Sequence, residues 1–182
     1  MSKFALTLFL VTVLVGDTQD TVLVGDTQDK DKTAPTFYAK TLDGEKFFLS
    51  EELKKQKPVV LSFFATWCAP CRKEIPVLNK IQNEHPGISF YLVDVSNLEQ
   101  GGIKLTEDPD EVRKMIESMN VTMTVLMDKY GVAAESYGAL ELPKTVVIDQ
   151  GGEIVYEKTG YESGDELAEL IKILQELEHV DE

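Results

Sequence analysis

The segment Pro58–Thr66, PVVLSFFAT, restricts the possible folds more than any other part of the sequence. It is almost continuously apolar, as is typical of a strand that is buried on both faces of a sheet. A second run of this kind, ISFYLVDV, follows at Ile88–Val95. Between the two runs, the segment from Ala69 to about Glu84 has apolar residues at helical spacing and ends at His85–Pro86–Gly87. The sequence therefore predicts a strand, a helix and a second strand at the centre of an α/β fold.

The segments before and after this unit extend the predicted sheet. Ala34–Lys40 and Glu45–Leu49 are expected to be strands of an additional N-terminal hairpin, and Ser50 is expected to cap a brief helix. Ser96–Glu107 has no regular pattern and is interpreted as a central insert, followed by a helix that starts at the cap Asp108. The remaining predictions are a strand at Met123–Met127, a helix at Val132–Tyr137, a hairpin of Leu142–Asp149 with Glu153–Lys158, and a terminal helix capped at Ser163. This order predicts a mixed sheet with helices on both faces.

The N-terminus has the pattern of a secretory signal peptide. Lys3 precedes an apolar run, Phe4–Val15, which is shorter than the ~20 residues that a membrane span needs. The nonapeptide TVLVGDTQD then occurs twice, at Thr12–Asp20 and Thr21–Asp29. Cleavage after export is the first interpretation and an uncleaved membrane anchor the second, because no A-x-A cleavage site is present. We therefore expect a leader at residues 1–30 and a folded domain at residues 31–182.

The charge of the chain excludes some classes of partner. The net charge is −14, whereas a surface that binds nucleic acid needs clustered lysines and arginines. The same charge disfavours electrostatic binding to anionic lipid. We therefore expect no nucleic-acid partner, and contact with a membrane only if the leader is not cleaved.

The two cysteines of the chain, Cys68 and Cys71, directly follow the first buried strand. A disulfide between them would close a ring of four residues and constrain little chain entropy, which disfavours a purely structural role. A structural zinc site usually has four Cys or His ligands, and nothing in the sequence places His179 near this pair. The spacing therefore predicts a redox-active pair, without a metal or another cofactor.

The position of the pair at a helix start predicts a different role for each cysteine. The first turn of a helix presents unpaired N–H groups and a partial positive charge, which favour a thiolate over a thiol. We therefore expect Cys68 to be the nucleophile. Cys71 lies one helical turn further, is expected to be more buried, and would resolve the mixed disulfide.

The segment FFATWCAPCRKEIP resembles the active site of the thioredoxin superfamily. The flanks APTFYAKTLDGEKFFLSEE and LPKTVVIDQGGEIVYEKTGY resemble its TlpA/ResA-like (redoxin/AhpC-TSA-type) branch of exported thiol–disulfide oxidoreductases. The likeness extends from about Asp31 to the C-terminal helix. It implies a thioredoxin-like fold and the reduction of disulfides in exported, periplasmic proteins, often in cytochrome c maturation. It also implies a membrane thiol reductant that restores the dithiol.

The resemblance also implies roles for residues around the cysteines. Trp67 matches a tryptophan that packs beside the reactive sulfur, and Ala69 and Pro70 lie between the cysteines, where the proline tunes the redox potential. Pro143 matches a proline whose bond from the preceding residue, here Leu142, is cis and faces the disulfide. The backbone of Leu142 would then pair with an extended substrate segment.

Glu74 matches a glutamate of this branch and is the candidate general acid–base for the thiol of Cys71. The alternative is a surface carboxylate beside Arg72 or Lys73. Ser62 stands where thioredoxin has a buried aspartate, which leaves Glu74 as the candidate proton acceptor.

Lys144 follows Pro143 where a small hydroxyl residue is common in the family. Its cation would either lie near the thiolate and favour it, or point to solvent.

Other functions are left open by the sequence. Related thiol peroxidases resemble P-x-x-x-T-x-x-C, but Leu61 and Ala65 stand where the proline and threonine would be. A non-catalytic adaptor is disfavoured because both cysteines and Trp67 are present. A disulfide oxidase or isomerase remains an alternative, because the direction of exchange follows the reduction potential.

Overall fold

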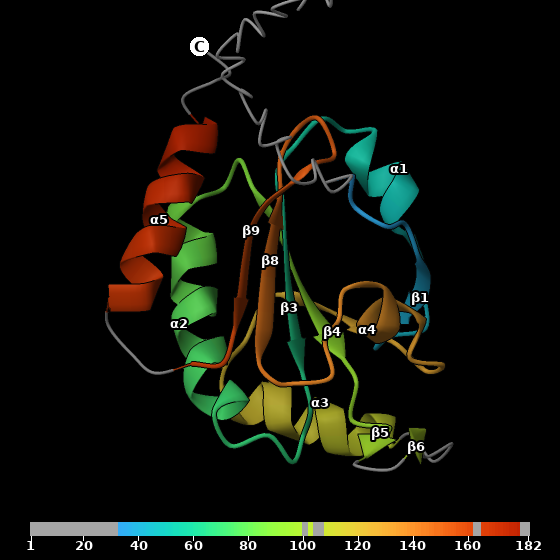
Figure 1. Ribbon diagram of the computed structural model, residues 1–182. Helices are drawn as coiled ribbons and strands as arrows, with labels where there is room; N and C mark the ends of the chain where they lie inside the picture. Colours follow the sequence, from blue (N-terminus) through green and yellow to red (C-terminus); the bar gives the residue numbers. More distant parts are fainter. Residues whose placement is uncertain (1–32, 100–101, 104–107, 162–164, 179–182) are drawn as a thin grey trace, which may run out of the picture. The chain divides into compact units, whose positions relative to one another are not determined.

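A mixed sheet forms the centre of the protein in the computed structural model, which describes residues 33–99, 102–103, 108–161 and 165–178 (Figure 1). In these ranges the main sheet has seven strands in the order β2-β1-β7-β4-β3-β8-β9. Its strands are β1 (Tyr38–Thr41), β2 (Lys46–Phe48), β3 (Val59–Phe64), β4 (Ser89–Asp94), β7 (Thr124–Met127), β8 (Lys144–Ile148) and β9 (Ile154–Thr159). The helices are α1 (Leu49–Leu53), α2 (Cys71–Glu84), α3 (Pro109–Ser118), α4 (Val132–Ser136) and α5 (Asp165–Glu178). The predicted α/β class and mixed sheet are confirmed.

The apolar run that starts at Pro58 forms the central strand, β3, as predicted. It pairs in parallel with β4 and antiparallel with β8, and all six of its residues are buried. Successive side chains point to opposite faces of the sheet, so Val60 and Phe64 pack in one core layer and Leu61 and Phe63 in the other. Helices α2, α3 and α5 pack against the first layer, and α1 and α4 against the second (Figure 1).

The N-terminal hairpin is confirmed, but its boundaries differ from the prediction. Strand β1 begins at Tyr38 rather than Ala34, because the preceding segment leaves the hairpin. The N–H of Ala34 donates to the carbonyl of Gly152 at 2.9 Å, in the turn between β8 and β9. The predicted cap at Ser50 is wrong: α1 already begins at Leu49, after an N-terminal residue that makes no side-chain cap.

The central insert contains more regular structure than predicted. Two short strands, β5 (Leu98–Glu99) and β6 (Gly102–Ile103), pair antiparallel within the segment that we expected to be irregular. Strands of two residues are too short to produce an alternating apolar and polar pattern in the sequence. The helix start at Asp108 is confirmed, because its carboxylate accepts the N–H groups of Asp110 and Glu111 at 3.1 and 3.3 Å.

The other predicted strands and the short helix α4 are present, with ends that differ by at most two residues. The terminal helix α5 buries Leu170 and Leu174 as its sequence pattern indicated. The predicted cap at Ser163 and the leader at residues 1–30 lie outside the described residues. None of the helices in the described ranges combines the length and the apolar character that crossing a membrane requires.

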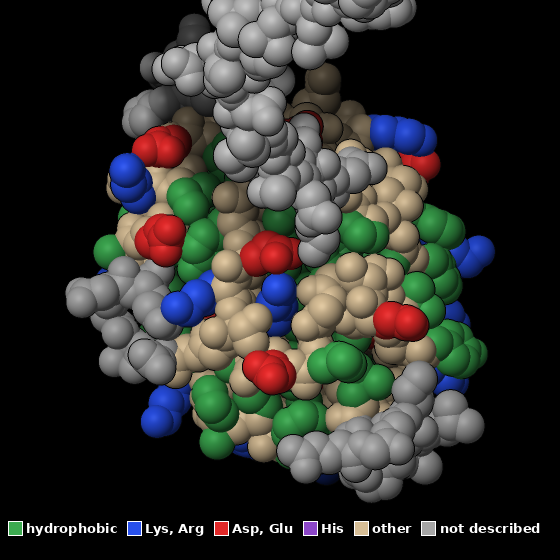
Figure 2. Space-filling model, viewed as in Figure 1, with side chains coloured by type: hydrophobic (Ala, Val, Ile, Leu, Met, Phe, Trp, Pro, Cys, Tyr) green, Lys and Arg blue, Asp and Glu red, His purple; other side chains and the backbone are tan. Residues whose placement is uncertain are grey.

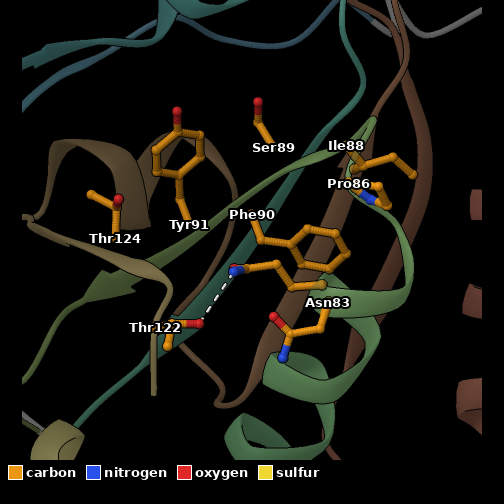
Figure 3. Close-up of a pocket in the computed structure, with 9 residues that line it drawn as sticks. Asn83, Pro86, Ile88, Ser89, Phe90, Tyr91, Thr122 and Thr124 are labelled. Atoms are coloured by element: carbon orange, nitrogen blue, oxygen red, sulfur yellow. Dashed lines mark hydrogen bonds between the residues drawn. The ribbon is translucent and has the colours of Figure 1, made fainter. Parts of the chain in front are cut away.

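A cavity of about 400 Å³ opens beside the start of β4 (Figure 3). The side chains of Gln82, Asn83, Thr122 and Thr124 line one part of it, and the amide of Gln82 donates to the hydroxyl of Thr122 at 3.4 Å. Ser89 also lines the cavity, and its hydroxyl donates to the carboxylate of Glu52, on α1, at 2.9 Å. This polar contact joins α1 to the sheet.

The carboxyl of Glu52 is expected to stabilise the fold only in its ionised form. Burial raises its pKa, but hydrogen bonds from Lys55, Ser89 and Tyr91, together with the charge of Lys55, outweigh burial and bring the pKa below 4.5. Stability from this group is therefore fully present above about pH 4.5 and is lost as the pH falls through the folded-state pKa. We expect Glu52→Gln to lower the free energy of unfolding by about 1–2 kcal/mol near pH 7, and by much less near pH 2.

Urea unfolding of Glu52→Gln and the wild type at the two pH values measures this difference. Glu51→Gln is the matched control, because Glu51 is exposed on the same helix and pairs only with the exposed Lys54 among the contacts described. An equal loss of stability at both pH values would contradict the predicted role of the ionised carboxylate.

Candidate active site

Both cysteines lie at the junction of β3 and α2, and their sulfurs form a disulfide. Cys71 is the first residue of α2, so the helix begins two residues later than predicted, after Ala69 and Pro70. The exposed fraction is 5% for Cys68 and 0% for Cys71, which confirms that Cys71 is the more buried. Ala69 and Pro70 are both exposed and form the surface between the two cysteines.

The N-terminus of α2 points at the sulfur of Cys68. The backbone N–H of Cys71 donates to Cys68 Sγ at 3.2 Å, and the N–H of Arg72 donates to the carbonyl of Cys68 at 3.4 Å. A helix leaves its first N–H groups without partners inside the helix, so these donors are available to a sulfur that lies just outside it. The N–H donated by Cys71 to Cys68 Sγ would stabilise the thiolate that the sequence predicts at Cys68.

Trp67 is more exposed than expected for a side chain that packs on a sulfur. Its exposed fraction is 54%, and its indole Nε1–H donates to the carbonyl of Ser96 at 3.2 Å. The sequence did not indicate Ser96 as a neighbour, because it lies 29 residues away in the chain.

Glu74, on α2, is buried between this helix and the sheet, with an exposed fraction of 5%. Its Oε2 accepts the hydroxyl of Ser62 at 3.3 Å and its Oε1 accepts the hydroxyl of Thr145 at 3.0 Å. Ser62 and Thr145 are opposite each other in the register of β3 and β8. The alternative of a surface carboxylate beside Arg72 is therefore wrong: Arg72 instead donates to the carbonyl of Thr66 at 2.6 Å. Thr145 escaped the sequence analysis because strand register is set by tertiary contacts.

The peptide bond between Leu142 and Pro143 is cis, as the resemblance implied. Pro143 is buried, and its carbonyl accepts the N–H of Gly160 at 2.7 Å. Leu142 is half-buried and packs against the core.

The expected solvent-facing position of Lys144 is wrong. Its ammonium group lies 3.5 Å from the carboxylate of Glu157 on β9, and only 11% of its side chain is exposed. Adjacent residues of a strand point to opposite faces, so Lys144 points away from the face on which Thr145 contacts Glu74.

Apolar groups are exposed beside the cysteines, among them the side chain of Trp67. On the face shown in Figure 2, hydrophobic side chains lie at several places, among them the lower end, where α2 begins and α3 lies in Figure 1. Within the described ranges, no three His, Cys, Asp or Glu side chains are arranged to hold a metal ion. The chemistry that this arrangement can supply is dithiol–disulfide exchange beside a buried carboxylate.

Comparison with known proteins agrees with this chemistry. The thioredoxin-like protein YneN of Bacillus subtilis (strain 168) is 35% identical over 122 residues, which are 66% of each chain. The thiol–disulfide oxidoreductase ResA of Bacillus cereus (strain ATCC 10987 / NRS 248) is 30% identical over 143 residues, which are 78% of this chain and 76% of that one.

Solved structures of thiol–disulfide proteins are also similar. MTB dsbF has a TM-score of 0.63 and 30% identity, and the likeness covers 76% of this chain and 94% of that chain. A putative thiol:disulfide interchange protein DsbE from Chlorobium tepidum has a TM-score of 0.66 and 26% identity, over 80% of this chain and 96% of that chain. These likenesses confirm the thioredoxin-like fold and the resemblance to ResA-like proteins. A model of the AhpC/TSA family matches residues 31–157, more than half of the sequence, and the chain therefore belongs to the AhpC/TSA family.

Proposed function

We propose that the protein is a thiol–disulfide oxidoreductase that reduces disulfides of exported proteins. The observation that carries this proposal is the Cys68–Cys71 disulfide at the start of α2, with a helix N–H donated to the sulfur of Cys68. The similarity to ResA, whose name states this activity, supports it.

The reaction begins with the reduced pair. The thiolate of Cys68 attacks one sulfur of the substrate disulfide, which forms a mixed disulfide and releases the other substrate sulfur as a thiol. The sulfur of Cys71 loses its proton and attacks Cys68 Sγ, which breaks the mixed disulfide and releases the second substrate thiol. Two electrons pass to the substrate, and the Cys68–Cys71 disulfide remains. A membrane thiol reductant then returns two electrons to the pair.

Glu74 is the proposed acceptor of the Cys71 proton. It lies in the first turn of the helix that Cys71 begins, and it is buried. The hydroxyls of Ser62 and Thr145 donate to its two oxygens and hold the carboxylate in place. A carboxylate fixed in this way is suited to general acid–base catalysis.

The substrate is proposed to bind as an extended segment beside the cis proline. The backbone of Leu142, next to Pro143, would pair with it as one strand pairs with another. The exposed side chains of Trp67, Ala69 and Pro70 would contact the residues next to the substrate disulfide. The exposed fraction of Trp67, 54%, supports such docking.

The proposed site of action is the periplasm, with residues 1–30 as the leader and residues 31–182 as the folded domain. The apolar run Phe4–Val15 after Lys3 supports export. The proposed substrates are proteins of cytochrome c maturation, which takes place at this location. If the leader is not cleaved, it would anchor the domain to the membrane.

The reduction potential of the Cys68–Cys71 pair, measured against glutathione redox mixtures, tests the direction of the reaction. We expect a value near the ~−270 mV of thioredoxin, together with reduction of insulin by the dithiol form. A value near the ~−120 mV of DsbA would mean that the protein oxidises its substrates and would overturn the assignment.

Thiol-dependent consumption of hydrogen peroxide is expected to be absent, because Leu61 and Ala65 replace the residues of the peroxidase motif.

A further inference from the structure

Ser96, the second residue after β4, makes hydrogen bonds with three other residues. Its hydroxyl and its backbone N–H both donate to Oδ1 of Asp94, the N–H at 3.2 Å. The same hydroxyl accepts the backbone N–H of Thr66 at 2.8 Å, and the Ser96 carbonyl accepts the indole N–H of Trp67 at 3.2 Å. Ser96 thus contacts both residues that precede Cys68.

Asp94 determines which way the Ser96 hydroxyl points. Its exposed fraction is 1%, and its Oδ1 accepts the hydroxyl of Ser96. The lone pairs of the hydroxyl are then left to accept the N–H of Thr66. The end of β4 is itself fixed, because Val95 N–H donates to Phe64 C=O at 2.9 Å and Asp128 N–H donates to Asp94 C=O at 3.0 Å.

The loop between β3 and Cys68 is therefore held from two sides. Thr66 donates its N–H to Ser96 and accepts Arg72 Nη2 at its carbonyl, at 2.6 Å. The indole N–H of Trp67 donates to Ser96, while the residue keeps an exposed fraction of 54%. A large side chain held in one orientation before binding loses less conformational entropy when a partner docks on it.

We propose that Ser96, oriented by Asp94, is a positioning residue that fixes the Thr66–Trp67 loop. The loop then holds the indole of Trp67 in the orientation that a polypeptide substrate contacts. The part that concerns substrate rests on the proposed function. The part that concerns the orientation of the indole does not.

Trp67 is the single tryptophan of the chain, so its fluorescence reports this orientation directly. In the full chain with its disulfide formed, we expect Ser96→Ala to lower the fluorescence anisotropy and to raise acrylamide quenching about twofold, because Thr66 N–H loses its acceptor. Asp94→Leu should have the same effect, whereas Asp94→Asn and Ser96→Thr, which keep the required oxygens, should remain near the wild type.

Ser118→Ala is the matched control, because it removes a hydroxyl that donates to the Met115 carbonyl at the end of α3. Circular dichroism confirms that each variant is folded at the temperature of the measurement. If the fluorescence of Ser96→Ala equals that of Ser118→Ala and the wild type, Ser96 does not position the indole and the inference fails.

Kinetics with insulin as the polypeptide substrate and dithiothreitol as the reductant tests the second part. We expect Ser96→Ala to raise KM about five- to tenfold and to change kcat less than about twofold, the pattern of a lost binding contribution. Alkylation of reduced Cys68 by iodoacetamide should keep its wild-type rate. An unchanged KM in a variant with altered fluorescence would overturn the role in substrate contact. If the wild-type protein reduces no insulin, the proposed function fails while the fluorescence still decides whether Ser96 positions Trp67.

Discussion

Cys71→Ser is expected to leave the protein covalently joined to its substrate through Cys68. The first attack needs only the Cys68 sulfur, which accepts the N–H at the start of α2 and is the more accessible of the two. The second step needs a thiol at position 71, where a serine hydroxyl cannot displace the substrate sulfur. Turnover with a disulfide substrate should fall by more than about 10³-fold.

Non-reducing electrophoresis and mass spectrometry measure the trapped species. Dithiothreitol should release it as the intact substrate and the intact variant. Cys68→Ser is the matched control and should give neither turnover nor an adduct, because the Cys71 sulfur is fully buried. An adduct that forms in Cys68→Ser and not in Cys71→Ser would reverse the two roles.

The second large effect is expected for Glu74→Gln, in the pH dependence of the step that resolves the mixed disulfide. Glutamine has nearly the same shape, and its amide oxygen can still accept a hydroxyl from Ser62 or Thr145. It cannot take a proton from Cys71, so the rate near pH 7 should fall by about 10²-fold. At sufficiently high pH a thiol ionises without a general base, so the difference from the wild type should become small toward pH 10.

Stopped-flow measurement of mixed-disulfide resolution between pH 5 and pH 10 tests this prediction. Glu84→Gln is the matched control, because Glu84 is exposed at the other end of α2 and lies 3.9 Å from the exposed Lys80. If the pH profiles of Glu74→Gln and the wild type coincide, the carboxylate does not handle the Cys71 proton. A smaller effect in Ser62→Ala than in Glu74→Gln is also expected, since the carboxylate would remain.

Much of the fold follows from patterns within short stretches of the chain. The apolar run that starts at Pro58 predicted the central strand β3, and the acidic cap at Asp108 predicted the start of α3. Their physical causes are local, because burial on both faces and helix capping depend on neighbouring residues. The pattern failed at Ser50, where α1 begins one residue before the expected cap and without a side-chain cap.

The sequence by itself determined the chemistry of Cys68 and Cys71, because the short turn that leads from β3 into α2 brings together two thiols three residues apart. Only the tertiary structure decided what surrounds them. Glu74 contacts Thr145 across 71 residues of chain, Trp67 contacts Ser96 across 29, and Lys144 lies on the opposite face of β8. Such contacts depend on strand order and register, and a shift of one residue in β8 would exchange the faces of Lys144 and Thr145. Register is set by the packing of both core layers at once, and no short stretch of sequence contains that information.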